Sequence, residues 1–325
     1  MAEKVIIRSV TIDKHGDYIP LEMMEEYVNT VNGKNKMRYL ANHRRDIPPI
    51  GYFDNAEISN LNSVYHTLIE PISYKNRTTA DWDEDLIIED AGKPLIFINR
   101  NDENLELLRI AIDKNNFTSM QSLGETGKQL KELHAEPIAL ELNMRKDLFP
   151  DPQLVITLAK YAFIFYPLIT PLMKKMGEKL AEDLADDLYK ACKVKAKNLV
   201  KKLSSSVRLV RQDIVPKDKV LNTIFEIPGD PYIELHIKSD DPTKIEKGLT
   251  TRNLSRVHQK IENLRRHVDI SEIYFKLNDK DKWDFNYLLT KDGKAIGTRS
   301  IFKKRDHLVN RINLSPTKAF SIGAE

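Results

Sequence analysis

His43 is the strongest candidate for a catalytic side chain in this sequence. It stands in the run Asn42-His43-Arg44-Arg45, directly after the predicted strand Met37–Ala41 and before a Pro-Gly turn. A histidine titrates near neutral pH and can act as general base toward a serine hydroxyl. Ser122, in a stretch predicted to be irregular, is the nominated nucleophile, and no acidic partner can be chosen. A surface or hydrogen-bonded strand histidine without catalytic role is the alternative.

The segment from Asn42 to Tyr52 resembles the histidine region of phage capsid-maturation (prohead) serine proteases. In that family a short strand ends in an Asn-His pair and a Pro-Ile-Gly turn follows, as Pro49-Ile50-Gly51 does here. The resemblance covers about residues 4–72 and implies that His43 is the general base beside a serine in a later strand. The predicted strand Pro94–Ile98 contains no serine. A domain that has kept the fold and lost the chemistry is therefore also possible under this resemblance.

Other ligand-binding patterns are absent from the sequence. The remaining histidines lack metal-ligand spacing, and the acidic run Asp81–Asp85 lacks the glycine of a calcium loop. No glycine-rich phosphate loop is present. Cys192 is the single cysteine, which excludes an internal disulfide and fits a reducing cytosol. We therefore expect no cofactor, no metal and no small-molecule ligand.

A second candidate region begins with the apolar run Leu154–Met173, in which Lys160 is the only charge. Its length would suffice to span a bilayer, but Pro167 and Pro171 would kink the helix. The sequence therefore predicts a short buried helix over residues 154–166, followed by an amphipathic helix that begins at Thr170-Pro171. A helical hairpin that a trigger releases into a membrane remains open.

The amphipathic helix ends in a basic stretch. No Asp or Glu occurs from Leu188 to Gln212, and no aromatic residue occurs between Lys190 and Arg211. Such a stretch attracts phosphate groups by about 1 kcal/mol per charge, and the lack of stacking residues favours lipid over nucleic acid. The alternative is a solvated helix end whose lysines favour the helix dipole. The candidate lipid or partner contacts are Leu158, Phe163, Ile164, Phe165, Lys190, Lys193, Lys197, Lys201 and Lys202.

Local patterns predict an N-terminal mixed α/β domain over residues 1–148. The alternation of apolar and polar residues indicates strands, and the 3.6-residue periodicity indicates helices. The predicted strands are Val5–Ile12, Met37–Ala41, Ile50–Ile58, Val64–Ile72, Pro94–Ile98 and Ile138–Leu142. The predicted helices are Leu21–Asn32, Glu103–Asp113 and Glu125–His134.

A central helical region over residues 149–204 and a C-terminal domain over residues 207–325 complete the prediction, with Ser204-Ser205-Ser206 as a linker. The C-terminal pattern is ββαβββ, a small sheet with a packed helix. Its strands are Val220–Ile227, Tyr232–Lys238, Ile273–Leu277, Trp283–Thr290 and Ala295–Phe302, and its helix carries an apolar stripe from Leu254 to Val268. The fold class is α+β.

The composition fits a folded soluble protein. The chain has 325 residues, 30% of them charged and 41% hydrophobic, and its net charge of +3 is too small to indicate a nucleic-acid binder. The first apolar run is too short for a signal peptide, so we expect a cytoplasmic protein, recruited to membranes only under some conditions.

We expect a non-enzymatic effector or assembly protein of a microbial or phage-related system. Its central helices would act in oligomer packing or conditional membrane association, with a protein partner, a second copy or an anionic membrane surface as the binding partner. A serine protease using His43 and a plain protein–protein interaction module are the alternatives.

Overall fold

The computed structural model describes residues 4–11, 18–97, 107–134, 137–143, 152–159, 179–214 and 217–313. The described residues form six α-helices and fourteen strands, and the protein is of the α+β class, as predicted. The chain divides into two compact units. Unit 1 comprises Met1–Arg100 and Tyr287–Glu325, and unit 2 comprises Asn101–Asn286. These units divide the chain at other places than the predicted domain boundaries.

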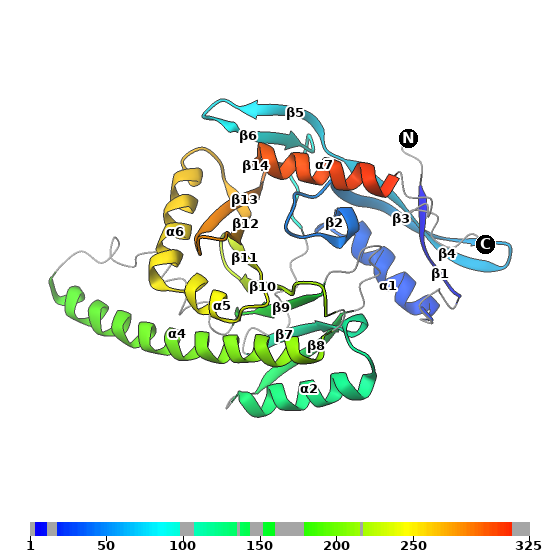
Figure 1. The fold of residues 1–325 in the computed structure, drawn as a ribbon. Coiled ribbons are helices and arrows are strands. Elements are labelled where there is room, and N and C mark those ends of the chain that lie inside the picture. Colours follow the sequence, from blue (N-terminus) through cyan, green and yellow to red (C-terminus); the bar gives the residue numbers. More distant parts are fainter. Residues whose placement is uncertain are drawn as a thin grey trace. The chain divides into compact units, whose positions relative to one another are not determined.

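Unit 1 contains a four-stranded sheet covered by helix α1 (Figure 1). The strand order is β1-β4-β3-β2, and all pairs are antiparallel. Val31 of α1 packs against Ala56 and Ile69 of the sheet, so the apolar face of α1 and the sheet share one core cluster. The bounds are β1 Val5–Ser9, α1 Leu21–Asn32, β2 Met37–Tyr39, β3 Gly51–Leu61 and β4 Val64–Ser73. The predicted bounds of α1 are confirmed.

The C-terminal residues complete unit 1. Strand β14 (Lys294–Thr298) pairs with β6 (Asp83–Asp90) on one side and with the end of β13 (Trp283–Thr290) on the other. Strand β5 (Lys75–Ala80) forms a hairpin with β6, and helix α7 (Arg299–Asn313) packs against β6 and β14. The sequence prediction extended the last strand to Phe302, whereas the strand ends at Thr298 and α7 follows.

A buried ion pair fixes α7 to this part of unit 1. The Arg305 guanidinium donates from Nη1 to Glu89 Oε2 and from Nη2 to Glu89 Oε1, each at 2.7 Å. Both side chains are less than 10% exposed. Arg77 and Asp306 extend the network toward solvent, with Arg77 Nη1 2.6 Å from Asp306 Oδ2. A bidentate geometry of this kind offsets much of the cost of burying the two charges.

Unit 2 is built on six strands in the order β12-β11-β10-β9-β7-β8, together with the first half of β13. The pairs β11–β12, β9–β10 and β7–β8 are parallel, and β10–β11 and β7–β9 are antiparallel. The strand bounds are β7 Leu108–Asp113, β8 Ile138–Asn143, β9 Gln153–Thr157, β10 Asn222–Ile227, β11 Tyr232–Lys238 and β12 Ile270–Leu277. The helix bounds are α2 Met120–Leu133, α4 Lys179–Asp213, α5 Thr243–Gly248 and α6 Thr251–Arg265.

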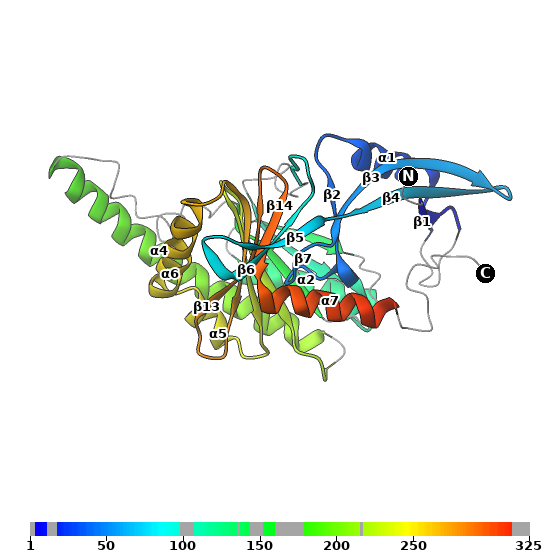
Figure 2. The same cartoon turned by 90° about the horizontal axis from the view of Figure 1, so that it is seen from above.

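The four helices of unit 2 form a layer on one face of this sheet (Figures 1 and 2). Gly127 of α2 lies against Leu140 of β8, and Gly248 of α5 lies against Ile237 and Leu277. Helix α4 packs on α2 and α5, and α6 packs on β12. The predicted order of strands and helices from Val220 to Thr298 is confirmed, because hairpin turns and an amphipathic helix are strong local signals.

Three predicted elements are wrong in type. Residues 154–157 were placed in a buried helix, but they belong to strand β9 (Gln153–Thr157), in which every residue is buried. An apolar run of this length suits a strand buried on both faces as well as a helix, and its β-branched Val155, Ile156 and Thr157 favour the strand. Leu108–Asp113, placed in a helix, is strand β7 for the same reason. Of the predicted strand Pro94–Ile98, the described residues form only an isolated bridge between Phe97 and Lys36.

The predicted linker Ser204-Ser205-Ser206 is also wrong, because α4 continues through it to Asp213. Ser206 Oγ donates to the Lys202 carbonyl at 3.0 Å, one turn back in the helix, and Ser204 Oγ donates to the Pro242 carbonyl at 3.0 Å. Serine hydroxyls often favour loops because they compete for backbone hydrogen bonds, but these two hydroxyls find carbonyl acceptors while the backbone stays helical.

Candidate functional site: the basic stripe of helix α4

Helix α4 is about 52 Å long, calculated from its 35 residues and the helical rise. Its C-terminal part buries one side in unit 2. The apolar residues of that side recur at helical spacing and are each less than 10% exposed: Leu199, Val200, Leu203, Val207 and Val210. Sequence periodicity therefore produces both the helix and its attachment to the unit.

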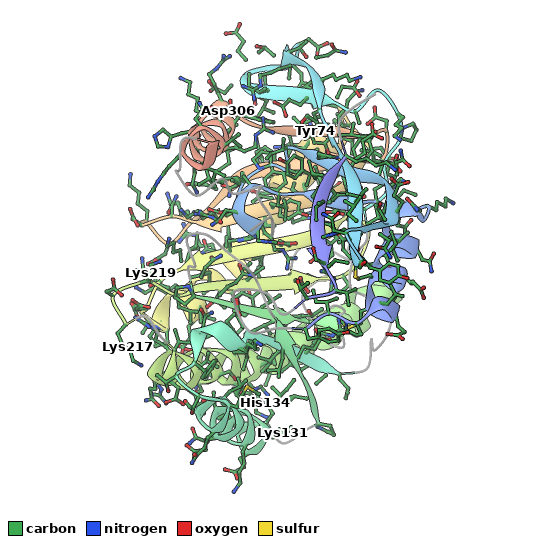
Figure 3. All side chains as sticks on the ribbon, turned by 90° about the vertical axis from the view of Figure 1, so that its right-hand side faces the viewer. Tyr74, Lys131, His134, Lys217, Lys219 and Asp306 are labelled. Carbon is green, nitrogen blue, oxygen red and sulfur yellow. The ribbon has the colours of Figure 1, made fainter. Side chains whose placement is uncertain are left out.

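Polar contacts fix the same part of α4 to α2. His134 ends α2, and its Nε2 lies 2.8 Å from Ser206 Oγ. Thr126 Oγ1 donates to Asp213 Oδ2 at 2.6 Å. Burial, together with the nearby Lys202 ammonium, lowers the pKa of His134, so the imidazole is neutral at neutral pH. Figure 3 labels Lys131, which lies in α2, and His134, which caps the end of this helix.

The end of α4 is held by the segment that follows it. Arg211 Nη2 donates to the Lys217 carbonyl at 2.8 Å, and Arg211 Nε lies 2.6 Å from Asp240 Oδ1. Lys217 Nζ donates to the Gln212 carbonyl. Lys217 and Lys219 are labelled in Figure 3. These bonds satisfy helix-end carbonyls and place cations where the helix dipole favours them.

The opposite side of α4 carries Lys197, Lys201 and Arg208, which we call the basic stripe. All three residues are exposed, and within the described part of the chain none of them forms an ion pair. At spacings of four and seven residues they lie on one side of the helix, over about 16 Å of its length. The stripe is therefore a linear array of available cations that can contact anionic groups.

The other residues that were predicted to contact lipid or a partner do not belong to the basic stripe. Lys202 is half-buried beside His134. Lys190 and Lys193 belong to helix α4, but their side chains are not among those that the structure describes. Phe163, Ile164 and Phe165 lie outside the described residues. Leu158 is completely buried, and its amide donates to the Glu226 carbonyl at 2.8 Å. In this structure Leu158 presents no surface to a bilayer. Of the helices that the structure describes, none is long and apolar enough to cross a membrane.

His43 was predicted to lie on a strand, but it lies in a tight turn of unit 1. Asn42 and His43 both have positive φ, at 48° and 52°, and the Arg44 amide donates to the Ala41 carbonyl at 3.0 Å. This is the pattern of a type I′ turn, in which glycine is preferred at the position of His43. The turn presents the His43 side chain at the surface.

The residues that follow His43 anchor the turn. The buried Asp46 carboxylate receives Arg44 Nε at 2.6 Å and Lys304 Nζ at 2.7 Å, and these cations hold the pKa of Asp46 far below its usual range. Tyr287 Oη donates to the Arg45 carbonyl at 3.0 Å.

Ser122, the nominated nucleophile, lies in unit 2, in the first turn of α2. Its amide donates to Ser119 Oγ at 3.1 Å, and the residue is half-buried. The irregular stretch predicted around Ser122 is therefore helical from Met120. The pairing of His43 with a serine stays a prediction.

Sequence reasoning missed a row of buried polar residues on the second face of the unit 2 sheet. Glu226 stands opposite Glu234 across β10 and β11, and Tyr274 stands next to Glu234 on β12. Both glutamates are less than 5% exposed. His236 Nε2 lies 3.0 Å from Glu234 Oε2. Polar residues at alternate positions of an otherwise apolar strand were the signal that could have revealed this row.

Donors within the sheet support these carboxylates. The Thr157 hydroxyl donates to Glu226, and the Tyr274 hydroxyl donates to the buried Glu272. A buried carboxylate requires such donors to offset its lost hydration. Within the described part of the chain, no three His, Cys, Asp or Glu side chains are placed to hold a metal ion. In this structure these groups lie in the interior and do not form an open catalytic surface.

Comparisons with known proteins do not assign the site. No protein-family model matches the chain, and no curated protein and no solved structure matches it either.

Proposed function

We propose that this chain is a non-enzymatic assembly or effector protein that docks on an anionic membrane surface through the basic stripe of α4. One observation carries the proposal: Lys197, Lys201 and Arg208 are exposed on one side of a helix whose opposite side is anchored in unit 2. A rigid row of cations on a fixed helix can meet a plane of phosphate groups without reorganisation. Less conformational entropy is then lost on binding.

The expected mode of binding is peripheral contact and not insertion. The apolar residues of α4 from Leu199 to Val210 are buried in the protein, so insertion of this part of the helix would require it to leave unit 2. Electrostatic attraction supplies about 1 kcal/mol per basic residue close to an anionic leaflet, hence about 3 kcal/mol for the stripe. Such binding is weak and reversible, as suits a protein that is recruited under some conditions only.

The chemistry of the stripe favours lipid over nucleic acid. The sequence from Lys197 to Arg208 contains no aromatic residue that could stack on a base. Vesicles are therefore the first binding partner to test.

The test compares two variants of equal charge. Lys201→Glu/Arg208→Glu changes the net charge from +3 to −1, and so does the control Arg266→Glu/Lys303→Glu, whose two positions are exposed and lie on other elements. On vesicles of phosphatidylserine and phosphatidylcholine, the first variant should bind at least about 30-fold more weakly than wild type, from about 1 kcal/mol per lost cation. The control should keep most of the binding.

Four outcomes would refute the proposal. The first three are the absence of wild-type binding to phosphatidylserine vesicles, an equal loss in both variants, and binding of duplex DNA or RNA in place of vesicles. Binding to pure phosphatidylcholine at the same strength would equally exclude an electrostatic mode.

A further inference from the structure

Helix α4 begins well before the residues that are seen to anchor it. Among the residues of α4 whose burial the structure describes, the first buried one is Leu199, and residues 179–198, which we call the arm, precede it over about 30 Å. Figures 1 and 2 both show the N-terminal half of α4 extending past α5 and α6. Near the base of the arm, Val194 is 62% exposed, and Lys197 and Asn198 are exposed as well.

The sequence of the arm is amphipathic. Leu180, Leu184, Leu188 and Ala191 occupy positions four, four and three residues apart, which share one side of a helix. In proteins, amphipathic helices gain most of their stability from packing of the apolar side. The arm therefore has the pattern of a helix that packs against another helix.

The charges of the arm reverse sign at Tyr189. Before it the charged positions are mainly acidic, and after it they are only basic. Asp183, Asp187, Lys190 and Lys197 fall at spacings of four, three and seven residues, along one edge of the apolar positions. One half of the arm thus complements the other half in charge.

We infer that the arm pairs with the arm of a second copy of this chain, in antiparallel orientation. An antiparallel pair centred on Tyr189 brings Asp183 and Asp187 within one turn of Lys197 and Lys190 of the second copy, and the reverse contacts follow by two-fold symmetry. A parallel pair would place like charges together along the whole arm. Complementary charges at the edges of the apolar side set the orientation of paired helices.

This inference shares Lys197 with the basic stripe and leaves the other two cations of the stripe free for the proposed membrane contact. In a pair centred on Tyr189 the second arm ends close to Leu199, so Lys201 and Arg208 lie beyond the overlap and remain available. Pairing would also place two basic stripes in one particle, which raises its avidity for an anionic surface.

The test is a charge exchange followed by light scattering coupled to size exclusion. Asp183→Lys/Asp187→Lys makes the whole edge basic, and Lys190→Glu/Lys197→Glu makes it acidic. Wild type should have twice the chain mass at tens of micromolar, each variant alone should have the mass of one chain, and their equimolar mixture should regain the doubled mass. Glu25→Lys/Asp218→Lys, at exposed positions outside the arm, is the charge-matched control of the first variant and should remain doubled.

Regained mass in the mixture also shows that the two variants fold, which circular dichroism of each variant checks separately. A wild-type protein with the mass of one chain would overturn the inference. So would variants that stay doubled, or a mixture of folded variants that does not pair.

Discussion

The ion pair between Arg305 and Glu89 makes a quantitative prediction about unit 1. Arg305→Met keeps most of the side-chain volume but removes the two 2.7 Å bonds to Glu89 and the 2.9 Å bond from Nη1 to the Pro49 carbonyl. Among the described residues, the Glu89 carboxylate, which is 8% exposed, then keeps its ion pair with Arg77, whose side chain is 43% exposed. Removing one partner of a buried pair costs about 3–5 kcal/mol, and an unpaired buried carbonyl alone costs about 1–3 kcal/mol. We expect a loss of at least about 3 kcal/mol.

Urea unfolding followed by circular dichroism measures this loss. The double variant Arg305→Met/Glu89→Leu removes both charges, so it should recover part of the stability that Arg305→Met loses. Together with the single variant Glu89→Leu it completes a double-mutant cycle, which gives the coupling energy of the pair. If Arg305→Met costs less than about 1 kcal/mol, or if the double variant is no more stable than the single one, the pair does not hold α7 in place and our reasoning fails.

Three further predictions concern other positions. Burial lowers the pKa of His258 from 6.5 to about 4, so the unfolded chain takes up a proton at higher pH than the folded protein does. The free energy of unfolding should therefore fall by about 1 kcal/mol as the pH drops from 6.5 to about 4. In urea titrations, His258→Gln should remove this pH dependence. Gly51→Ala should prevent stable folding of unit 1, because the added Cβ would lie 1.8 Å from the Ile72 carbonyl oxygen, whereas Gly124→Ala in α2 meets nothing and should be neutral or stabilising in thermal melts. His43→Gly should raise the melting temperature by relieving the positive φ; an unchanged or lower value would contradict the turn geometry.

Local signals were sufficient for several elements. Helix α1 ends at Gly33 as expected, because an apolar stripe and a following glycine mark a helix and its end within a few residues. Strands β10 and β11 flank a Pro-Gly turn, and such a turn can be recognised from the local sequence alone. In such segments the determining contacts lie close in sequence.

Long-range pairing could not be predicted from the sequence. Strand β14 pairs with β6, about two hundred residues away in the chain, and neither segment has a local pattern that identifies the other as its partner. The apolar segment around Val155 has no periodicity, so its assignment to a strand depends on its neighbours β7 and β10.

For the candidate site the sequence indicated the charge but not its orientation. The basic composition of α4 was evident, whereas the exposure of Lys201 and the partial burial of Lys202 beside His134 depend on how α4 packs against α2.

The position of β9 leads to a last prediction, about salt. The apolar residues from Leu154 to Leu158 are buried in this structure, and so is the apolar side of α4 from Leu199 onward. Under the proposed function, these segments would therefore contact a membrane through charge. Raising the ionic strength from 0.1 M to 1 M shortens the screening length from about 10 Å to about 3 Å. Phosphatidylserine vesicles should therefore release the wild-type protein at 1 M salt in a flotation assay. Protein that stays bound at 1 M salt would instead indicate insertion of an apolar segment, and Leu158→Asp would then distinguish release of β9 from insertion of another part of the chain.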